Sequence, residues 1–164
     1  MDLPVFEQAA DLLRGLVPRE LGPLRCRARR YGMKVWLGPE TPPRVHYEAQ
    51  VIAAAHCPGA ATLALEIGFH SEHPDAAHND AVLARLTAAE RKWRRHLGPE
   101  PHVGEFLGRR EWRRVSETWP DPDLGDGELA FEVAARLTDY ITAFEPLLEE
   151  RPVRASAGRP RAGR

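Results

Sequence analysis

Residues 62–70 alternate between two kinds of side chain, and a repeat of two residues is the period of a β-strand. One parity holds the apolar residues Leu63, Leu65, Ile67 and Phe69, and the other holds Thr62, Glu66, Gly68 and His70. A strand with one apolar side needs neighbours to complete its hydrogen bonds and a second layer to cover that side. The segment therefore predicts a sheet that is covered by helices on one face.

Two earlier segments, residues 24–37 and 44–54, show the same alternation and are expected to be strands. Within the first segment the apolar side chains move from even positions such as Ala28 to odd positions such as Met33. A bulge or tight turn at residues 31–32 would return both halves to one face of the sheet. The short connections between successive strands favour antiparallel pairing.

Apolar residues at helical spacing predict three helices, over residues 3–16, over 76–97 and from about 127 to 148. Two short strands within residues 102–119 are separated by only three residues, which predicts a hairpin. The order of elements is α-β-β-β-α-β-β-α. We therefore expect an α+β fold in which three helices cover an antiparallel sheet of about five strands.

This order is similar to that of the type III secretion chaperones and of the YbjN-like proteins of bacteria. The similarity spans residues 1–150 and concerns the order of elements; no residue motif accompanies it, so it implies no site residue. Proteins of those families are small, bind segments of other proteins and often pair. The resemblance implies an adaptor or chaperone-like protein without catalytic activity or cofactor, whose partner is another protein or a second copy of itself.

The charges of the chain are divided unevenly between a body and a tail. Residues 151–164 contain five arginines and no acid, whereas residues 1–150 carry a formal charge of −6. We expect one domain over residues 1–150 and a disordered, arginine-rich tail, because the tail has almost nothing apolar to bury. An acidic body is a poor surface for nucleic acid, so any such contact is expected only through the tail.

The start of the chain and its cysteines predict a cytoplasmic protein. Acidic residues stand where a signal peptide has basic ones, and no apolar run approaches the length of a membrane span, so we expect no membrane partner. Cys26 and Cys57 have a spacing that fits no metal motif, and a chain of 164 residues needs no disulfide framework. Both are expected to be reduced thiols.

Pairing of residues 44–54 with residues 62–72 would bring the polar side chains of both strands onto one face. The residues gathered there are His46, Glu48, Glu66, His70 and Glu72. One interpretation is an exposed sheet face on which arginines and glutamates of neighbouring strands form ion pairs. The arginines are Arg25, Arg27 and Arg29, and the expected partners are Glu48 and Glu66.

A metal site is the second interpretation of the same residues. His46, Glu66 and His70 form a set of two imidazoles and one carboxylate, which suits zinc, iron or manganese. His73 and His78 follow and could supply another ligand. The spacing matches no standard motif such as H-E-x-x-H. This interpretation predicts a metal-dependent enzyme, a hydrolase, as the alternative function.

A binding surface for a protein partner is the third interpretation. Trp112, Arg114 and Trp119 lie on the last predicted strand, and tryptophan and arginine are the residues that contribute most at interfaces. The two tryptophans have opposite parities, so at least one should face away from the core. The polar face that holds Glu48 and Glu66 is the other candidate surface.

Overall fold

The computed structural model describes residues 4–149, so the tail predicted at 151–164 lies outside the described residues. The helices are α1 (Val5–Leu16), α2 (Ala76–Ala88), α3 (Glu90–Leu97) and α4 (Leu129–Leu148). The strands are β1 (Leu24–Arg29), β2 (Gly32–Leu37), β3 (Val45–Ala53), β4 (Leu63–Ser71), β5 (His102–Phe106) and β6 (Arg109–Pro120). In this part of the chain, no helix has both the length and the apolar character needed to cross a bilayer.

The six strands form one antiparallel sheet with the order β1-β2-β3-β4-β6-β5. The α+β class and the antiparallel pairing are confirmed, but the expected number of strands was one too few. Of the bulge or tight turn expected at residues 31–32, the structure has the tight turn, at residues 30–31. Residues 24–37 are therefore a hairpin of two strands and not a single strand, and the hairpin pairs Ala28 with Met33 and Arg29 with Gly32. Residues directly opposite each other share a face, so the change of parity keeps the apolar side chains on one side.

The single helix expected over residues 76–97 is broken at Ala89, where α2 ends and α3 begins. The Leu86 carbonyl accepts hydrogen bonds from the Ala89 amide (3.1 Å) and from the Trp93 indole (2.9 Å). The indole therefore satisfies a carbonyl at the end of α2, where the α-helical ladder stops. The break turns Trp93 into the core, where its ring lies 5.5 Å from that of Phe144.

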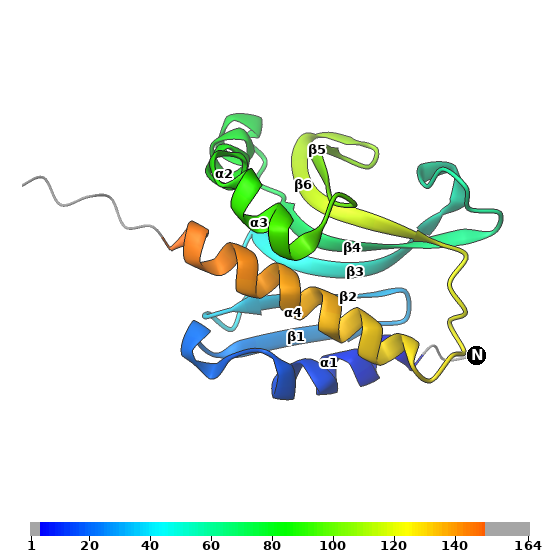
Figure 1. Ribbon diagram of the computed structural model, residues 1–164. Coiled ribbons are helices and arrows are strands. Elements are labelled where there is room, and N and C mark those ends of the chain that lie inside the picture. The colour runs from blue at the N-terminus through cyan, green and yellow to red at the C-terminus, as the bar shows by residue number, and fades with distance from the viewer. Residues whose placement is uncertain (1–3, 150–164) are drawn as a thin grey trace, which may run out of the picture.

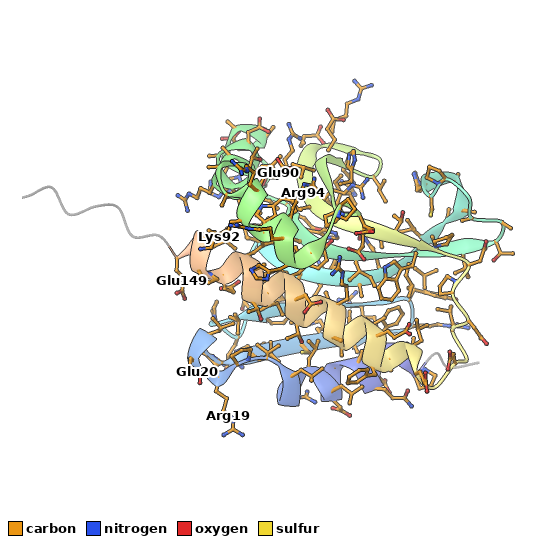
Figure 2. All side chains as sticks on the ribbon, viewed as in Figure 1. Arg19, Glu20, Glu90, Lys92, Arg94 and Glu149 are labelled. Carbon is orange, nitrogen blue, oxygen red and sulfur yellow. The ribbon has the colours of Figure 1, made fainter. Side chains whose placement is uncertain are left out.

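The hydrophobic core lies between the apolar face of the sheet and the helices. Helices α1, α3 and α4 lie over the same side of the sheet (Figure 1). Phe69 of β4 packs edge to face against Tyr47 of β3 at 5.6 Å and against Phe144 of α4 at 5.7 Å. Charged side chains of this layer, such as those of Lys92 and Glu149, point outward (Figure 2).

The opposite side of the sheet, called the polar face below, carries the polar side chains of the central strands. They include Lys34, His46, Glu48, Gln50, Glu66, His70 and Arg114. The β5–β6 hairpin covers part of this face, because the Phe106 ring lies 4.7 Å from the His70 ring and 5.5 Å from the Trp112 ring. The prediction of a solvent-exposed face is therefore wrong at its centre.

Gly68 of β4 permits the close approach of β6 behind this face. Its backbone has a φ of +153°, and a Cβ built there would lie 2.6 Å from the Ser116 Cα and would also overlap the Val115 carbonyl oxygen. Real Cβ atoms do not approach that closely, so a larger residue would force β4 and β6 apart. The absence of a side chain also leaves room on the polar face between Glu66 and His70.

Candidate metal centre

The register of β3 and β4 brings the histidines and glutamates of the polar face together. His46 pairs with His70, and Glu48 pairs with Gly68, so Glu48 lies between the two polar positions of β4. Glu72 follows β4 and continues its ladder, because its amide donates to the Arg44 carbonyl at 2.8 Å. The gathering of these side chains on one face, predicted from their parity, is confirmed.

The histidines and glutamates of the polar face are among the most buried ionisable residues of the described chain. The side chain of His70 is fully buried and that of His46 is 2% exposed, and the side chains of Glu48 and Glu72 are about one-tenth exposed. Charged residues are seldom buried to this extent unless they are paired or bind a metal.

Four donor atoms converge, one from each of His46, Glu48, His70 and Glu72, and all lie within 4.8 Å of one another. These four residues are called the His–Glu cluster below. The Nε2 atom of His46 lies 3.5 Å from Glu72 Oε1 and 3.9 Å from Glu48 Oε2. The Nδ1 atom of His70 lies 2.6 Å from Glu48 Oε2 and 3.6 Å from Glu72 Oε1.

These separations are close to those of a coordination shell. Four tetrahedral ligands at 2.0–2.2 Å from a metal are separated from one another by about 3.3–3.6 Å. Three of the four measured separations lie within a few tenths of an ångström of that range. The fourth, between His70 and Glu48, is a hydrogen bond that would have to lengthen.

Each histidine of the cluster has its second ring nitrogen held by another group. The Nδ1 of His46 donates to the Pro43 carbonyl oxygen at 3.0 Å, which directs its Nε2 into the cluster. The Nε2 of His70 donates to Glu66 at 2.8 Å, which directs its Nδ1 into the cluster. Backbone carbonyls and carboxylates are the partners that orient metal-binding histidines in proteins.

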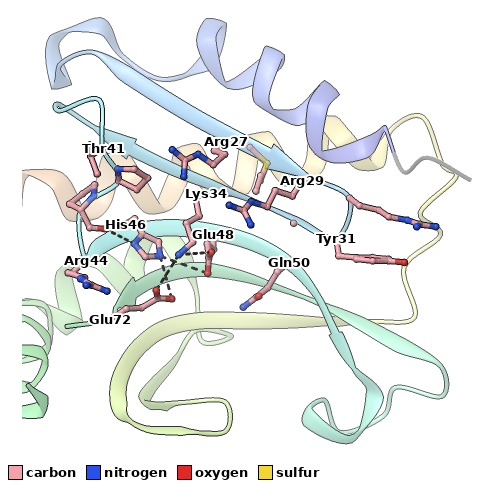
Figure 3. A pocket seen from close by; sticks show the side chains of 15 residues that line it. Arg27, Arg29, Tyr31, Lys34, Thr41, Arg44, His46, Glu48, Gln50 and Glu72 are labelled. Carbon is pink, nitrogen blue, oxygen red and sulfur yellow. Dashed lines mark hydrogen bonds and ion pairs between the residues drawn. The ribbon is translucent and has the colours of Figure 1, made fainter. Parts of the chain in front are cut away.

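The two glutamates of the cluster are held in the same way. The Nζ of Lys34 lies 3.3 Å from Glu48 Oε1 and 3.2 Å from Glu72 Oε2. Lysine therefore occupies one oxygen of each carboxylate and leaves the other oxygen facing the histidines. Figure 3 shows the Lys34 side chain between the two carboxylates, with His46 beside them.

One buried atom of the cluster has no hydrogen bond within residues 4–149. It is the Nε2 of His46, the only such buried side-chain atom in that range. Because Nδ1 carries the hydrogen that Pro43 accepts, Nε2 presents either a lone pair toward two carboxylates or an N–H without a suitably placed acceptor. The N–H form is an ion pair with both carboxylates but makes no hydrogen bond, and in the neutral form the lone pair is free to bind a cation held between the carboxylates.

The carboxylates raise the pKa of both histidines. Burial opposes the charged form of His70, but Glu66, Glu48 and Glu72 outweigh it and raise its pKa well above the ordinary value. Burial also opposes the charge on His46, and the nearby Glu48 and Glu72 carboxylates again raise its pKa.

The glutamates shift in the opposite direction. Burial alone would raise the pKa of Glu48, but His46 and His70 outweigh burial and lower it to about 2. The pKa of Glu72 is lowered against the effect of burial by the same histidines and by Lys34. The pKa of Glu66 is lowered against burial by His70 and by hydrogen bonds from Ser116 and Gln50. All three carboxylates therefore stay ionised, and those of Glu48 and Glu72 face the cluster.

The structure brings two of the three residues of the predicted metal set together. His46 and His70 each direct a nitrogen into the cluster, but Glu66 accepts a hydrogen bond from the far side of His70 instead. Glu48 and Glu72 supply the carboxylates that converge. His73 and His78 stack on each other with ring centroids 4.3 Å apart and contribute no donor atom to the cluster.

The predicted lattice of arginine–glutamate pairs is wrong. The cationic partner of Glu48 is Lys34, and Glu66 is bound by His70 and by the Gln50 amide at 3.1 Å. Sequence reasoning missed Lys34. Its signal was the change of parity at residues 31–32, which places Lys34 on the polar face once the segment is read as a hairpin.

The residues proposed as a protein-binding surface are not one surface. Arg114 is 8% exposed and lies on the polar face, where it donates to the Glu105 carbonyl and to Ser116 Oγ. Trp112 shares that face and packs on Phe106. Trp119 has the opposite parity and packs against the core, with its indole donating to Glu117. The expectation that one tryptophan faces away from the core is confirmed for Trp112.

Three residues of the His–Glu cluster, His46, Glu48 and Glu72, form part of the wall of a cleft of about 730 Å³. The cleft is bounded by the β1–β2 hairpin, by β3 and by the loop before it (Figure 3). Thr41, Pro42 and Pro43 of that loop form one side of the opening. The volume falls within the range of small-molecule sites, which is roughly 300–1,000 Å³.

Comparison of the chain with protein-family models, with curated proteins and with solved structures finds no match. The resemblance of the element order to the secretion chaperones and YbjN-like proteins therefore stays a prediction. What the protein does has to be inferred from the geometry of the His–Glu cluster and its cleft.

Proposed function

We propose that the protein is a metal-dependent enzyme that binds zinc, iron or manganese through His46, Glu48, His70 and Glu72. Two imidazoles and two carboxylates form a mixed donor set, and these three metals accept both kinds of ligand. Each ligand has an orienting partner, as metal ligands in proteins commonly do. The metal would lie in the wall of the cleft.

The observation that carries the proposal is the Nε2 of His46, which has ion-pair contacts but no hydrogen bond within the described residues. It is buried, its orientation is set by the Pro43 carbonyl, and it faces the Glu72 and Glu48 carboxylates at 3.5 and 3.9 Å. A cluster that served only as an ion-pair network would be expected to satisfy this nitrogen, as it satisfies both nitrogens of His70.

The position of the site favours a catalytic metal over a structural one. The hydrophobic core lies on the other side of the sheet and does not depend on the His–Glu cluster. The four protein donors would complete a tetrahedral shell, as in structural sites, but the cluster borders a cleft large enough for a small molecule, where a metal that accepts a fifth ligand could bind water. A metal there could lower the pKa of a bound water, and hydrolysis is the reaction class that uses such a water most directly.

The adaptor or chaperone-like function stays a second prediction. Glu66 and Arg114, two residues named for it, are 0% and 8% exposed, so a partner could reach them only after the polar face had opened. A contact through another surface, with another protein or with a second copy of the chain, is compatible with the metal site.

We propose a cytoplasmic location for the enzyme. Within the described residues, Cys26 and Cys57 form no disulfide. Burial raises the pKa of the Cys26 thiol to about 11, which keeps that thiol protonated and unreactive. Two reduced cysteines are what a reducing compartment favours.

The direct test is titration of the purified chain with zinc, iron(II) and manganese by calorimetry after treatment with a chelator. We expect one equivalent of at least one metal to bind the native protein, and His46→Ala to weaken that binding at least about 100-fold, since a ligand is lost. His56→Ala is the matched control, because His56 is exposed and outside the cluster. Native protein that binds no metal would refute the proposal.

A second variant tests the orienting role of Glu66. Glu66→Gln keeps the size of the side chain but removes the charge that faces His70 Nε2, so metal affinity should fall about 10–100-fold without loss of the site. Hydrolysis is assayed with p-nitrophenyl esters and phosphates, comparing metal-loaded native protein with His46→Ala. A metal-loaded protein no more active than this variant would limit the proposal to metal binding.

A further inference from the structure

We infer that the cleft binds a small oxyanion, a molecule with a phosphate or carboxylate group, and that this group contacts both the arginines of the cleft and the metal. The inference rests on the proposed metal site and adds a class of substrate to it. Five of the residues that line the cleft are lysine or arginine and only two are acidic. The lining is therefore cationic, although residues 1–150 have a net negative charge.

The arginines that matter come from different parts of the chain. Arg27 and Arg29 lie on β1, and Arg44 lies in the loop before β3. Figure 3 shows Arg27 and Arg29 near Lys34, and Arg44 beside Glu72. All three are exposed and none makes an ion pair with any residue between positions 4 and 149, although the Arg27 guanidinium lies 5.9 Å from the centre of the Trp36 ring. Their N–H groups are therefore available to a bound anion.

A pairing between like charges supports a binding role. Arg27 lies directly opposite Lys34 in the β1–β2 ladder. Like charges at such positions destabilise a sheet, and sequences tend to break local rules of this kind at functional sites. Lys34 is itself neutralised by Glu48 and Glu72, but Arg27 has no acidic partner in the described part of the chain. An anion bound beside Arg27 would relieve the repulsion.

Protection of the sheet edge explains only some of the arginines that line the cleft. Strand β1 is an edge strand, and arginines on an edge discourage pairing with other chains. Edge protection does not require Arg44, which belongs to another segment, or the location of all three arginines around one cleft. Planar guanidinium groups bind phosphate and carboxylate with two hydrogen bonds, which makes such groups the expected occupants.

The size of the cleft indicates a small molecule rather than a polyanion. A volume of about 730 Å³ holds a molecule of metabolite size. A nucleic acid would need a longer cationic surface than these few residues provide, and the body of the chain is acidic. Three residues of the His–Glu cluster border the same space, so an oxygen of the bound group would lie close to the residues that would hold the metal.

The test is calorimetric titration with inorganic phosphate and, separately, with oxalate at low ionic strength. Each is added to the metal-free chain and to the chain loaded with its preferred metal. We expect at least one of the two anions to bind, and to bind at least about fivefold more tightly when the metal is present. Binding that the metal does not strengthen, or no binding of either anion, would overturn the inference.

Variants then locate the binding site. Arg27→Gln combined with Arg29→Gln should weaken anion binding at least about tenfold, because charge-assisted contacts are lost. Arg85→Gln combined with Arg91→Gln is the matched control, since both residues are exposed on α2 and α3, which do not line the cleft. Equal weakening in both double variants would mean a general charge effect and would also overturn the inference.

Metal titrations of the same variants separate this inference from the proposed function. The variant with changes at Arg27 and Arg29 should bind metal as the native protein does, because neither arginine contacts the His–Glu cluster. Native protein that binds metal but no anion would refute this inference and leave the proposed function standing. Native protein that binds no metal would refute the proposed function as well.

Discussion

At the scale of single residues, hydrogen bonding and charge decide what each acidic side chain can do. Glu48 is buried and has its pKa lowered to about 2 by His46 and His70 against the opposing effect of burial. Asp121 is exposed and has its pKa lowered to about 2 by hydrogen bonds from backbone amides. Two carboxylates with similar pKa values therefore have different causes, a cationic environment in one case and backbone donors in the other.

Asp121 stabilises the start of β4. Its carboxylate accepts hydrogen bonds from the Ala61 and Thr62 amides at 2.7 Å and from the Thr62 hydroxyl at 2.8 Å. Its own backbone has a φ of +45°, a conformation that aspartate and asparagine adopt more readily than most residues. A side chain 58 positions later in the chain than Leu63 thus anchors the entry to the strand.

The pH dependence of this contact is predictable. The pKa of Asp121 is lowered when the protein folds, so its contribution to stability is complete above the ordinary value of 3.8 and is lost as the pH falls toward about 2. Asp121→Asn keeps an acceptor oxygen but cannot titrate. We expect native protein to exceed this variant in free energy of unfolding at pH 5, and the excess to shrink by pH 2.5, as measured by urea denaturation. If the difference in free energy of unfolding between native protein and Asp121→Asn does not change with pH, the pKa of Asp121 is not lowered by folding.

At the scale of elements, two neighbouring strands build almost the whole candidate site. Strand β3 supplies His46 and Glu48, and β4 with the residue that follows it supplies His70 and Glu72. Antiparallel strands place opposite residues about 4.5–5.5 Å apart, which is the spacing that convergent ligands need. The neighbours β2 and β6 add Lys34 and the close packing behind Gly68.

Gly68 is the element-scale feature most open to a test. Gly68→Ala should lower the free energy of unfolding by about 2–4 kcal/mol, because the new Cβ overlaps the β6 backbone and the φ of +153° disfavours a side chain. Chemical denaturation measures the change. Gly59→Ala is the matched control, since Gly59 also has a positive φ (+89°) but has open space around it. If Gly68→Ala lowers the free energy of unfolding no more than Gly59→Ala does, the close approach of β6 does not exclude a side chain at position 68.

At the scale of the whole molecule, the sheet separates the hydrophobic core on one side from the candidate functional site on the other. The apolar face and the helices contain the hydrophobic core, and the polar face holds the His–Glu cluster and the cleft. The two sides are joined only through the sheet, so the chemistry of one side can change with little effect on the packing of the other.

This separation predicts that the protein folds without metal. After treatment with a chelator, far-ultraviolet circular dichroism and cooperative thermal unfolding should be retained. A metal at 100 times its Kd should then add about 2.7 kcal/mol of stability and raise the Tm by several degrees. The His46→Ala variant should show no such rise. A chain that unfolds when metal is removed would instead indicate a structural metal site.

Sequence patterns predicted much of this organisation correctly. The alternation in residues 62–70 predicted the strand β4, and the parities of residues 44–54 and 62–72 predicted that His46 and His70 would share a face. The break at Ala89 was not predictable, because the Trp93 indole satisfies the Leu86 carbonyl only once Trp93 has packed against α4. The exchange of roles between Glu66 and Glu48 was not predictable either, since parity places both on one face and does not say which way each carboxylate turns.

By itself, then, the amino-acid sequence determined the strands, their faces and the side on which the ionisable residues gather, because these follow from a local repeat of two residues. Only the tertiary structure decided that the polar face is covered and that one nitrogen of His46 is left without a hydrogen bond. These properties depend on the β5–β6 hairpin and the loop before β3, and contacts between segments far apart in the chain leave no periodic signal in the sequence.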